Sequence, residues 1–285
     1  MRKKILTIIV LLATYSCLIA QPHYVSVGLR GGAGSYLAAG GVLDNRLAAN
    51  FMVDAGYTYF WPVDNVELGI HTGLSFGYTG GRYRMALDEQ YRNIDYLGHP
   101  MDYTITAESV QEKVNGFTME IPAMFAFRWN GMVMNAGMKL QVPMYYRYHQ
   151  QLSSTTVQAY YPDYDVTVVD EKITGIVDPS DYAKSGRRDT GNVSLLLGLE
   201  LGYEWQLTPS DMIGLMGYLD GALYSHPAGQ HTEHVVDVAP ISNAENPVPA
   251  VDVNTIVGTY ATRLNYLDFG VKVYYRFDVL HYLNK

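Results

Sequence analysis

Cysteine, charged residues and long apolar runs are scarce in this sequence of 285 residues. The single cysteine, Cys17, excludes a disulfide framework and a metal site built from several thiolates. Beyond the N-terminus, no apolar run approaches the roughly 18 to 20 residues that a spanning helix needs, which excludes a helical membrane protein. Only 17% of the residues are charged, and the formal net charge is −8 without a basic stripe. Nucleic acid is therefore not an expected partner, because phosphate binding requires clustered Lys and Arg.

Tyrosine, by contrast, is abundant, with 25 Tyr against 8 Phe. Its apolar ring and polar tip suit a boundary between an apolar phase and water. Hydrophobic residues make up 48% of the chain, which together with the low charge argues against disorder. The length suits one large domain or two small ones.

Residues 1–20 have the pattern of a secretory signal peptide, followed by a single predicted domain at residues 21–285. Arg2, Lys3 and Lys4 precede a short apolar run, and Ala20 supplies the small residue before the cut. A lipoprotein anchored at Cys17 and an uncleaved anchor helix are the alternatives. The segment before Cys17 fits the first poorly, and the short, interrupted apolar run argues against the second.

Apolar side chains alternate with small or polar ones over unusually long stretches, which is the period of a β-strand. In 193–207 every odd position is apolar, and 132–148 and 267–277 show the same alternation. The same test predicts strands at 23–36, 46–61, 66–83, 114–129 and 212–225, which makes eight in all.

The connections between these strands alternate between short and long. Tight turns are predicted at 62–65, 130–131 and 208–211, and the Asn130-Gly131 pair is a strong hairpin signal. Long loops are predicted at 37–45, 84–113, 149–191 and 226–258. This segregation predicts an all-β fold: an eight-stranded antiparallel up-and-down transmembrane β-barrel with short periplasmic turns and long extracellular loops.

The three tryptophans, Trp61, Trp129 and Trp205, each end a predicted strand close to a short turn. They therefore predict an aromatic girdle at one membrane interface. A water-soluble, lipocalin-like barrel is the alternative, with its apolar face directed inward. Its other face would be rich in Lys and Glu, whereas here that face is mostly Gly, Ser, Thr and Asn, which favours the membrane.

Eight strands leave an interior that side chains fill, so charged residues on the inward face need partners. Counting from the turns predicts one mid-barrel level, which holds Arg30, Asp54, Glu120, Lys139, Glu200, Asp220 and Asp268. On this count Lys139 lies between Glu120 and Glu200. Arg30 lies between Asp54 and Asp268, and Asp220 has no evident partner. A structural plug of ion pairs is the favoured interpretation, and a gated ion or proton path is the alternative.

The predicted loops offer weaker signals. His226, His231, Glu233 and His234 are candidate metal ligands by residue type, but their spacing matches no template, so no metal or other cofactor is expected. The tyrosines and carboxylates of 149–191 have the composition of a contact surface. Ser225 and His226 are neighbours whose side chains would point to opposite faces of a strand, so a lipid-modifying enzyme is a minor alternative.

Three segments resemble the small single-domain outer-membrane β-barrel family of gram-negative bacteria, in particular the Bacteroidota type. They are Ala20-Gln21 at the predicted cleavage point, the glycine-rich first strand at 28–34, and the closing strand at 269–277. The resemblance implies export, insertion by the barrel assembly machinery and residence in the outer membrane. The chain departs from the family pattern by continuing eight residues past Phe277.

The function expected from these observations is that of a non-enzymatic outer-membrane barrel that presents surface loops. Its expected partners are outer-membrane lipid and an envelope protein or surface ligand that contacts 84–113, 149–191 and 226–258. Membrane integrity, adhesion and docking remain open as its role. A narrow channel or secretion-apparatus component is the alternative.

Overall fold

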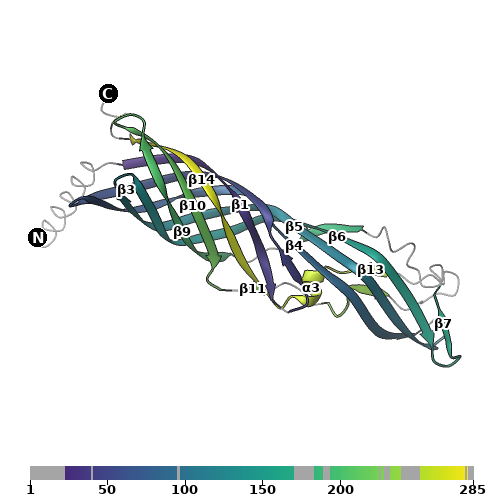
Figure 1. Cartoon of the computed structure of the whole chain (residues 1–285). Coiled ribbons are helices and arrows are strands. Elements are labelled where there is room, and N and C mark those ends of the chain that lie inside the picture. Colours follow the sequence, from purple (N-terminus) through teal and green to yellow (C-terminus); the bar gives the residue numbers. More distant parts are fainter. Residues whose placement is uncertain are drawn as a thin grey trace, which may run out of the picture.

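A closed ring of strands forms the body of the molecule in the computed structural model (Figure 1). The structure describes residues 23–39, 41–94, 97–169, 183–188, 193–224, 226–227, 232–238, 251–279 and 281. The ring strands are β1 (His23–Ala39), β3 (Ala48–Val63), β4 (Val66–Ile94), β5 (Pro100–Trp129), β6 (Met132–Tyr161), β9 (Ser194–Gln206), β10 (Asp211–Ala222) and β14 (Arg263–Asp278). Each pairs antiparallel with its neighbours, and β14 closes the ring on β1.

The predicted eight-stranded antiparallel up-and-down barrel is thus confirmed within the described residues. All eight predicted strands are present. Their short connections lie at 64–65, 130–131 and 207–210. Asn130 and Gly131 have φ angles of 48° and 82°, the positive values that a tight two-residue hairpin requires.

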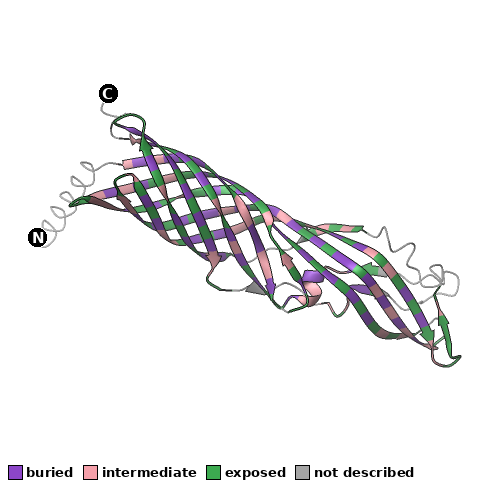
Figure 2. Cartoon of the chain, viewed as in Figure 1, coloured by how far each residue is buried: buried purple, intermediate pink, exposed green. Residues whose placement is uncertain are grey.

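Within the barrel, burial alternates along every ring strand, and apolar and polar side chains face the opposite way to those of a water-soluble barrel (Figure 2). Apolar side chains point outward: Phe125 is 64% exposed, Leu197 57% and Val27 53%. Polar and charged side chains point inward and are buried. Among the described residues, no helix combines the length and the apolar character required to cross a membrane.

The hydrogen-bonded rows climb as they pass round the barrel. One row passes through Tyr59, Ile70, Phe125, Ala136, Leu199, Leu219, Phe269, Ala33 and Ala49. The row leaves β3 at Tyr59 and returns to it at Ala49, ten residues away. Residues equally far from their turns therefore lie at different heights, because the strands tilt relative to the barrel axis.

Three ring strands continue far beyond the barrel and form a projection, visible where β4, β5 and β6 leave the ring (Figure 1). β4 and β5 pair as far as Ile94 and Pro100, and β5 and β6 pair as far as Asp102 and Tyr160. The prediction of loops at 84–113 and 149–191 is therefore wrong for most of the described residues in these two ranges. The first is one long hairpin, and the second contains the end of β6, β7 (Val166–Val168) and β8 (Ala183–Arg188).

The other two predicted loops also contain regular structure. The range 37–45 holds the end of β1 and the start of β2 (Asp44–Arg46), which pairs with β4. The described parts of 226–258 hold β11 (His226–Pro227), β12 (Val236–Val238), β13 (Val251–Val253) and the beginning of α3 (Ile256–Tyr260).

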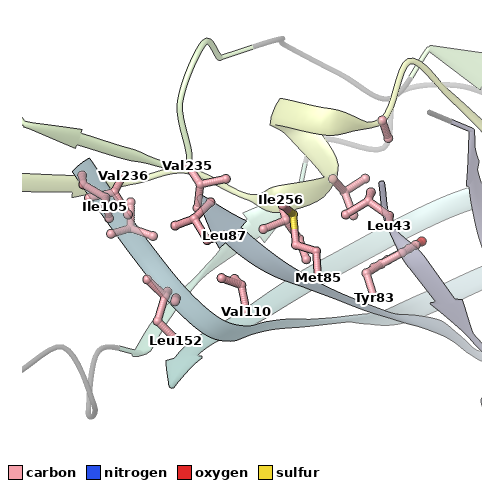
Figure 3. Packing of buried hydrophobic residues seen from close by; sticks show 14 of the residues in the cluster. Leu43, Tyr83, Met85, Leu87, Ile105, Val110, Leu152, Val235, Val236 and Ile256 are labelled. Atoms are coloured by element: carbon pink, nitrogen blue, oxygen red, sulfur yellow. The ribbon is translucent and has the colours of Figure 1, made fainter. Parts of the chain in front are cut away.

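The projection has an apolar core of its own (Figure 3). The described residues 232–238 and 251–260 form the β12–α3 segment, from which Val235, Val236 and Ile256 pack onto the face of the sheet that carries Leu87 and Ile105. All five side chains are at most 2% exposed. The opposite face of the projecting sheet is exposed and polar, as expected for a surface in water.

Candidate functional site

A network of ion pairs crosses the middle of the barrel. Arg30 on β1 pairs with Glu120 on β5 and, at 2.8 Å, with Asp220 on β10. Lys139 on β6 lies 2.9 Å from both Glu200 and Asp220. Asp220 thus joins the two cations. These five side chains are at most 3% exposed, so the network is shielded from water.

A second group of charges extends this network toward the short turns. Lys272 lies 3.3 Å from Glu200, and Arg276 lies 2.5 Å from Glu204. Arg128 pairs with Glu67 and lies 3.6 Å from Glu204. Apart from Glu200, none of these residues belongs to the predicted mid-barrel level. However, the alternation of 193–207 and 267–277 already directs Glu204, Lys272 and Arg276 inward.

All seven charged residues predicted at mid-barrel are buried. The predicted contact of Lys139 with Glu200 is present, but the partners predicted for Arg30 and Asp220 differ from those observed. Asp220 bridges the two cations instead of lacking a partner. Asp268 accepts hydrogen bonds from Tyr218 and Tyr266, at 3.3 and 3.2 Å, and the ion-pair partners of Arg30 are Glu120 and Asp220.

The partners of Arg30 differ from those predicted because the hydrogen-bonded rows climb as they pass round the barrel. Arg30 lies directly beside Met52 on β3 and Lys272 on β14, so Asp54 and Asp268 are not its register partners. A long guanidinium side chain reaches across the narrow interior instead. For Arg30, contacts across the lumen therefore replace contacts with the adjacent strands.

Tyrosine side chains separate the charged interior from the apolar core of the projection. The hydroxyls of Tyr36 and Tyr146 lie 2.8 Å apart, and the rings of Tyr36 and Tyr266 have centroids 4.9 Å apart. Tyr146 also bonds Thr79, and Tyr83 donates to the backbone carbonyl of Tyr36 at 2.6 Å. Charges, tyrosines and apolar side chains thus follow one another along the barrel axis.

Buried polar side chains fasten the β12–α3 segment to the projecting strands. Glu89 on β4 accepts from the backbone N–H of Val235 at 2.9 Å and from the hydroxyl of Tyr260 at 2.7 Å. Glu112 on β5 accepts from the N–H of Val257 at 3.2 Å. Burial, together with the Glu89 hydrogen bond, raises the pKa of Tyr260 above its usual value.

A surface ion pair adds a further link. Lys184 on β8 pairs with Asp252 on β13. The hydrogen bond from Lys184 lowers the pKa of the Asp252 carboxyl. These links make the projection a packed unit.

The predicted interface aromatics lie close to the short turns. Trp61 is half-buried beside Leu68, and Trp129 and Trp205 are 45% and 48% exposed. Tyr203 and Trp205 have ring centroids 5.2 Å apart on the outside of β9. The girdle itself stays a prediction.

The predicted metal ligands are only partly within the described residues. His231 and the side chain of His226 lie outside them, as does Ser225. Glu233 is exposed, and the His234 ring stacks on Tyr91 with centroids 4.5 Å apart. No cluster of metal-ligating side chains occurs in the described part of the chain.

The far end of the projection exposes apolar side chains. The β4–β5 and β6–β7 turns meet there, where the Tyr164 hydroxyl lies 3.1 Å from His99. The exposed set comprises Ile94, Leu97, Tyr164, Val166 and Val169, each at least 48% exposed. Such a cluster is characteristic of a surface that contacts another molecule.

No family model matches this chain, and no curated protein matches it. Among solved structures, it is similar to Neisserial surface protein A, with 10% identity and a TM-score of 0.31, over 90% of this chain and 96% of that one. It is also similar to Ail, the attachment invasion locus protein of Yersinia pestis, in complex with the heparin analogue sucrose octasulfate. That match has 12% identity and a TM-score of 0.31, over 90% and 99% of the two chains. The outer membrane protease OmpT from Escherichia coli matches with 8% identity and a TM-score of 0.27, over 90% and 96%. Similarity at this level carries no argument about function.

Proposed function

We propose that the protein is a non-enzymatic barrel of the outer membrane that holds a rigid projection at the cell surface as a contact surface. The observation that carries this proposal is the contrast between the two halves of the molecule. The barrel interior is filled by ion pairs, whereas the projection has a packed core and an exposed apolar end.

The outer surface of the barrel supports its insertion in a membrane. Apolar side chains cover it as far as Tyr78 on β4 and Phe117 on β5, which are 39% and 45% exposed. Four residues further toward the projection, Arg82 and Lys113 occupy the same outer face. Such an abrupt change from apolar to charged is expected at the edge of a bilayer.

The buried network argues against a water-filled path through the barrel. Arg30, Lys139 and Asp220 meet at its centre with oppositely charged neighbours within hydrogen-bond distance. Eight strands leave little more room than these side chains occupy. Separating buried partners would be costly, because each would lose its counter-charge in a low-dielectric interior.

Conductance in a planar lipid bilayer tests this proposal. We expect no resolved current steps from the protein, either intact or with residues 88–106 replaced by an Asn-Gly turn. Leu87 and Ala107 are register partners, so the short turn joins strands that already pair. A silent parent with a conducting shortened variant would mean that the projection acts as a lid on a pore. Steps from the parent would favour the channel alternative. Folding of both proteins is checked by the change in gel migration on boiling.

A further inference from the structure

Basic side chains from neighbouring strands gather on the outer face where the apolar surface of the barrel ends. This group, the basic belt, consists of Arg46 on β2, Arg82 on β4, Lys113 on β5, Arg147 and His149 on β6, and Arg187 on β8. All six side chains are exposed. The belt is notable in a chain of net charge −8 whose sequence contains no basic stripe.

Like charges in the belt face one another directly. Arg46 pairs in register with Arg82, and Arg82 with Lys113, while the His149 imidazole is the register partner of Lys113 on the other side. Like charges on directly opposite residues of a sheet destabilise it. Among the described residues, no carboxylate lies within 4.0 Å of Arg82 or Lys113, and the one acid paired within the belt is Asp44, 3.0 Å from Arg46.

A second pair of cations repeats the arrangement. Arg147 and Arg187 are register partners on β6 and β8. Both guanidinium groups lie over the ring of Tyr145, at 5.2 and 5.5 Å from its centroid. The shared ring holds the two groups close together, with their remaining N–H donors available to a planar or tetrahedral anion.

The position of the belt indicates what kind of anion it meets. Tyr78 on β4, Phe117 on β5 and Met144 on β6 lie on the barrel side of the belt and are 39 to 53% exposed. A soluble anion would contact only the charges. A lipid would place its acyl chains on the apolar surface and its phosphates on the belt.

We propose that the basic belt binds the phosphate groups of phosphorylated lipids in the outer leaflet around the barrel. Guanidinium groups donate paired hydrogen bonds to phosphate oxygens, and the Lys113 ammonium adds a point charge. The bound phosphates relieve the repulsion between Arg82 and its two basic neighbours. The inference rests on the proposed insertion in the outer membrane but is independent of what the end of the projection contacts.

Native mass spectrometry of the full chain in neutral detergent tests the proposal. Diphosphorylated lipid A is the probe, and dephosphorylated lipid A and inorganic pyrophosphate are the comparisons. The double variant Arg82→Gln/Lys113→Gln should bind the probe at least about tenfold more weakly than the parent, since each basic residue near an anionic lipid surface contributes substantially to binding. Arg92→Gln is the matched control, because Arg92 is exposed on the same strand but lies near the end of the projection beside Asp102.

Several outcomes would overturn the proposal. The first is that the double variant binds diphosphorylated lipid A as tightly as the parent does. The second is that the parent binds diphosphorylated and dephosphorylated lipid A equally well. Pyrophosphate bound as tightly as the lipid would make the belt a site for soluble anions.

Arg82→Lys keeps the charge and should keep most of the binding. The change in gel migration on boiling reports barrel folding separately, so failure to fold is distinguishable from loss of lipid binding.

Discussion

Replacing Asp220 with alanine should destabilise the barrel by about 3–5 kcal/mol, which is the typical cost of removing one partner from a buried ion pair. Asp220 accepts hydrogen bonds from Arg30 at 2.8 Å and from Lys139 at 3.0 Å. Its removal leaves two buried cations to share Glu120 and Glu200. The measurement is the urea midpoint for loss of the compact gel band in detergent micelles.

A control and an intermediate variant define this test. Asp88→Ala removes an exposed acid from the projection and should change stability by no more than about 0.5 kcal/mol. Asp220→Asn keeps the size and one acceptor oxygen, so its midpoint should fall between those of the parent and Asp220→Ala. If Asp220→Ala unfolded at the same urea concentration as Asp88→Ala, the network would not be what holds the interior together.

Leu199→Arg should destabilise the inserted barrel by about 2–4 kcal/mol, because it directs a guanidinium group into the hydrocarbon region. Leu199 lies on the outer face of β9 and is 45% exposed, midway between the short turn and the far end of the strand. In a water-soluble barrel the same change would replace an exposed leucine with a better-solvated side chain. The measurement is again the urea midpoint, here in lipid vesicles.

The matched control for Leu199→Arg is Gln90→Arg on the projection. Gln90 is also an exposed strand residue, but it lies on the projection, in water in the proposed arrangement. Its replacement should shift the midpoint by no more than about 0.5 kcal/mol. Equal effects of the two arginines would mean that the apolar face of β9 is not in contact with lipid.

The alternation of side chains was sufficient to predict the eight ring strands, but it did not predict the projection. On β4 the inward residues up to Thr79 are polar or small, and those from Tyr83 to Leu87 are apolar. Inside and outside therefore exchange character at the end of the barrel. A search for strands with an apolar outer face therefore ends at this exchange, although burial continues to alternate with a period of two as far as Glu89.

Burial of the charged residues was also predictable from the sequence, but most of their pairing was not. Arg30 and Glu120 are 90 positions apart and meet across the lumen. Their meeting depends on ring closure and on the ten-residue climb of the rows, neither of which is encoded locally. The basic belt was missed for the same reason, because pairing of β2, β4, β5, β6 and β8 is what assembles it.

The central claim is that the barrel lies in the outer membrane with its projection in the external medium. Labelling of single cysteines on cells with a membrane-impermeant maleimide tests it directly. Cys17 is the only native cysteine, so no other thiol competes beyond that position. We expect Gln90→Cys to be labelled on intact cells, Asn65→Cys in a short turn only after the outer membrane is opened, and Leu199→Cys in neither state. Labelling of Leu199→Cys by the aqueous reagent, or of Asn65→Cys before Gln90→Cys, would contradict the account.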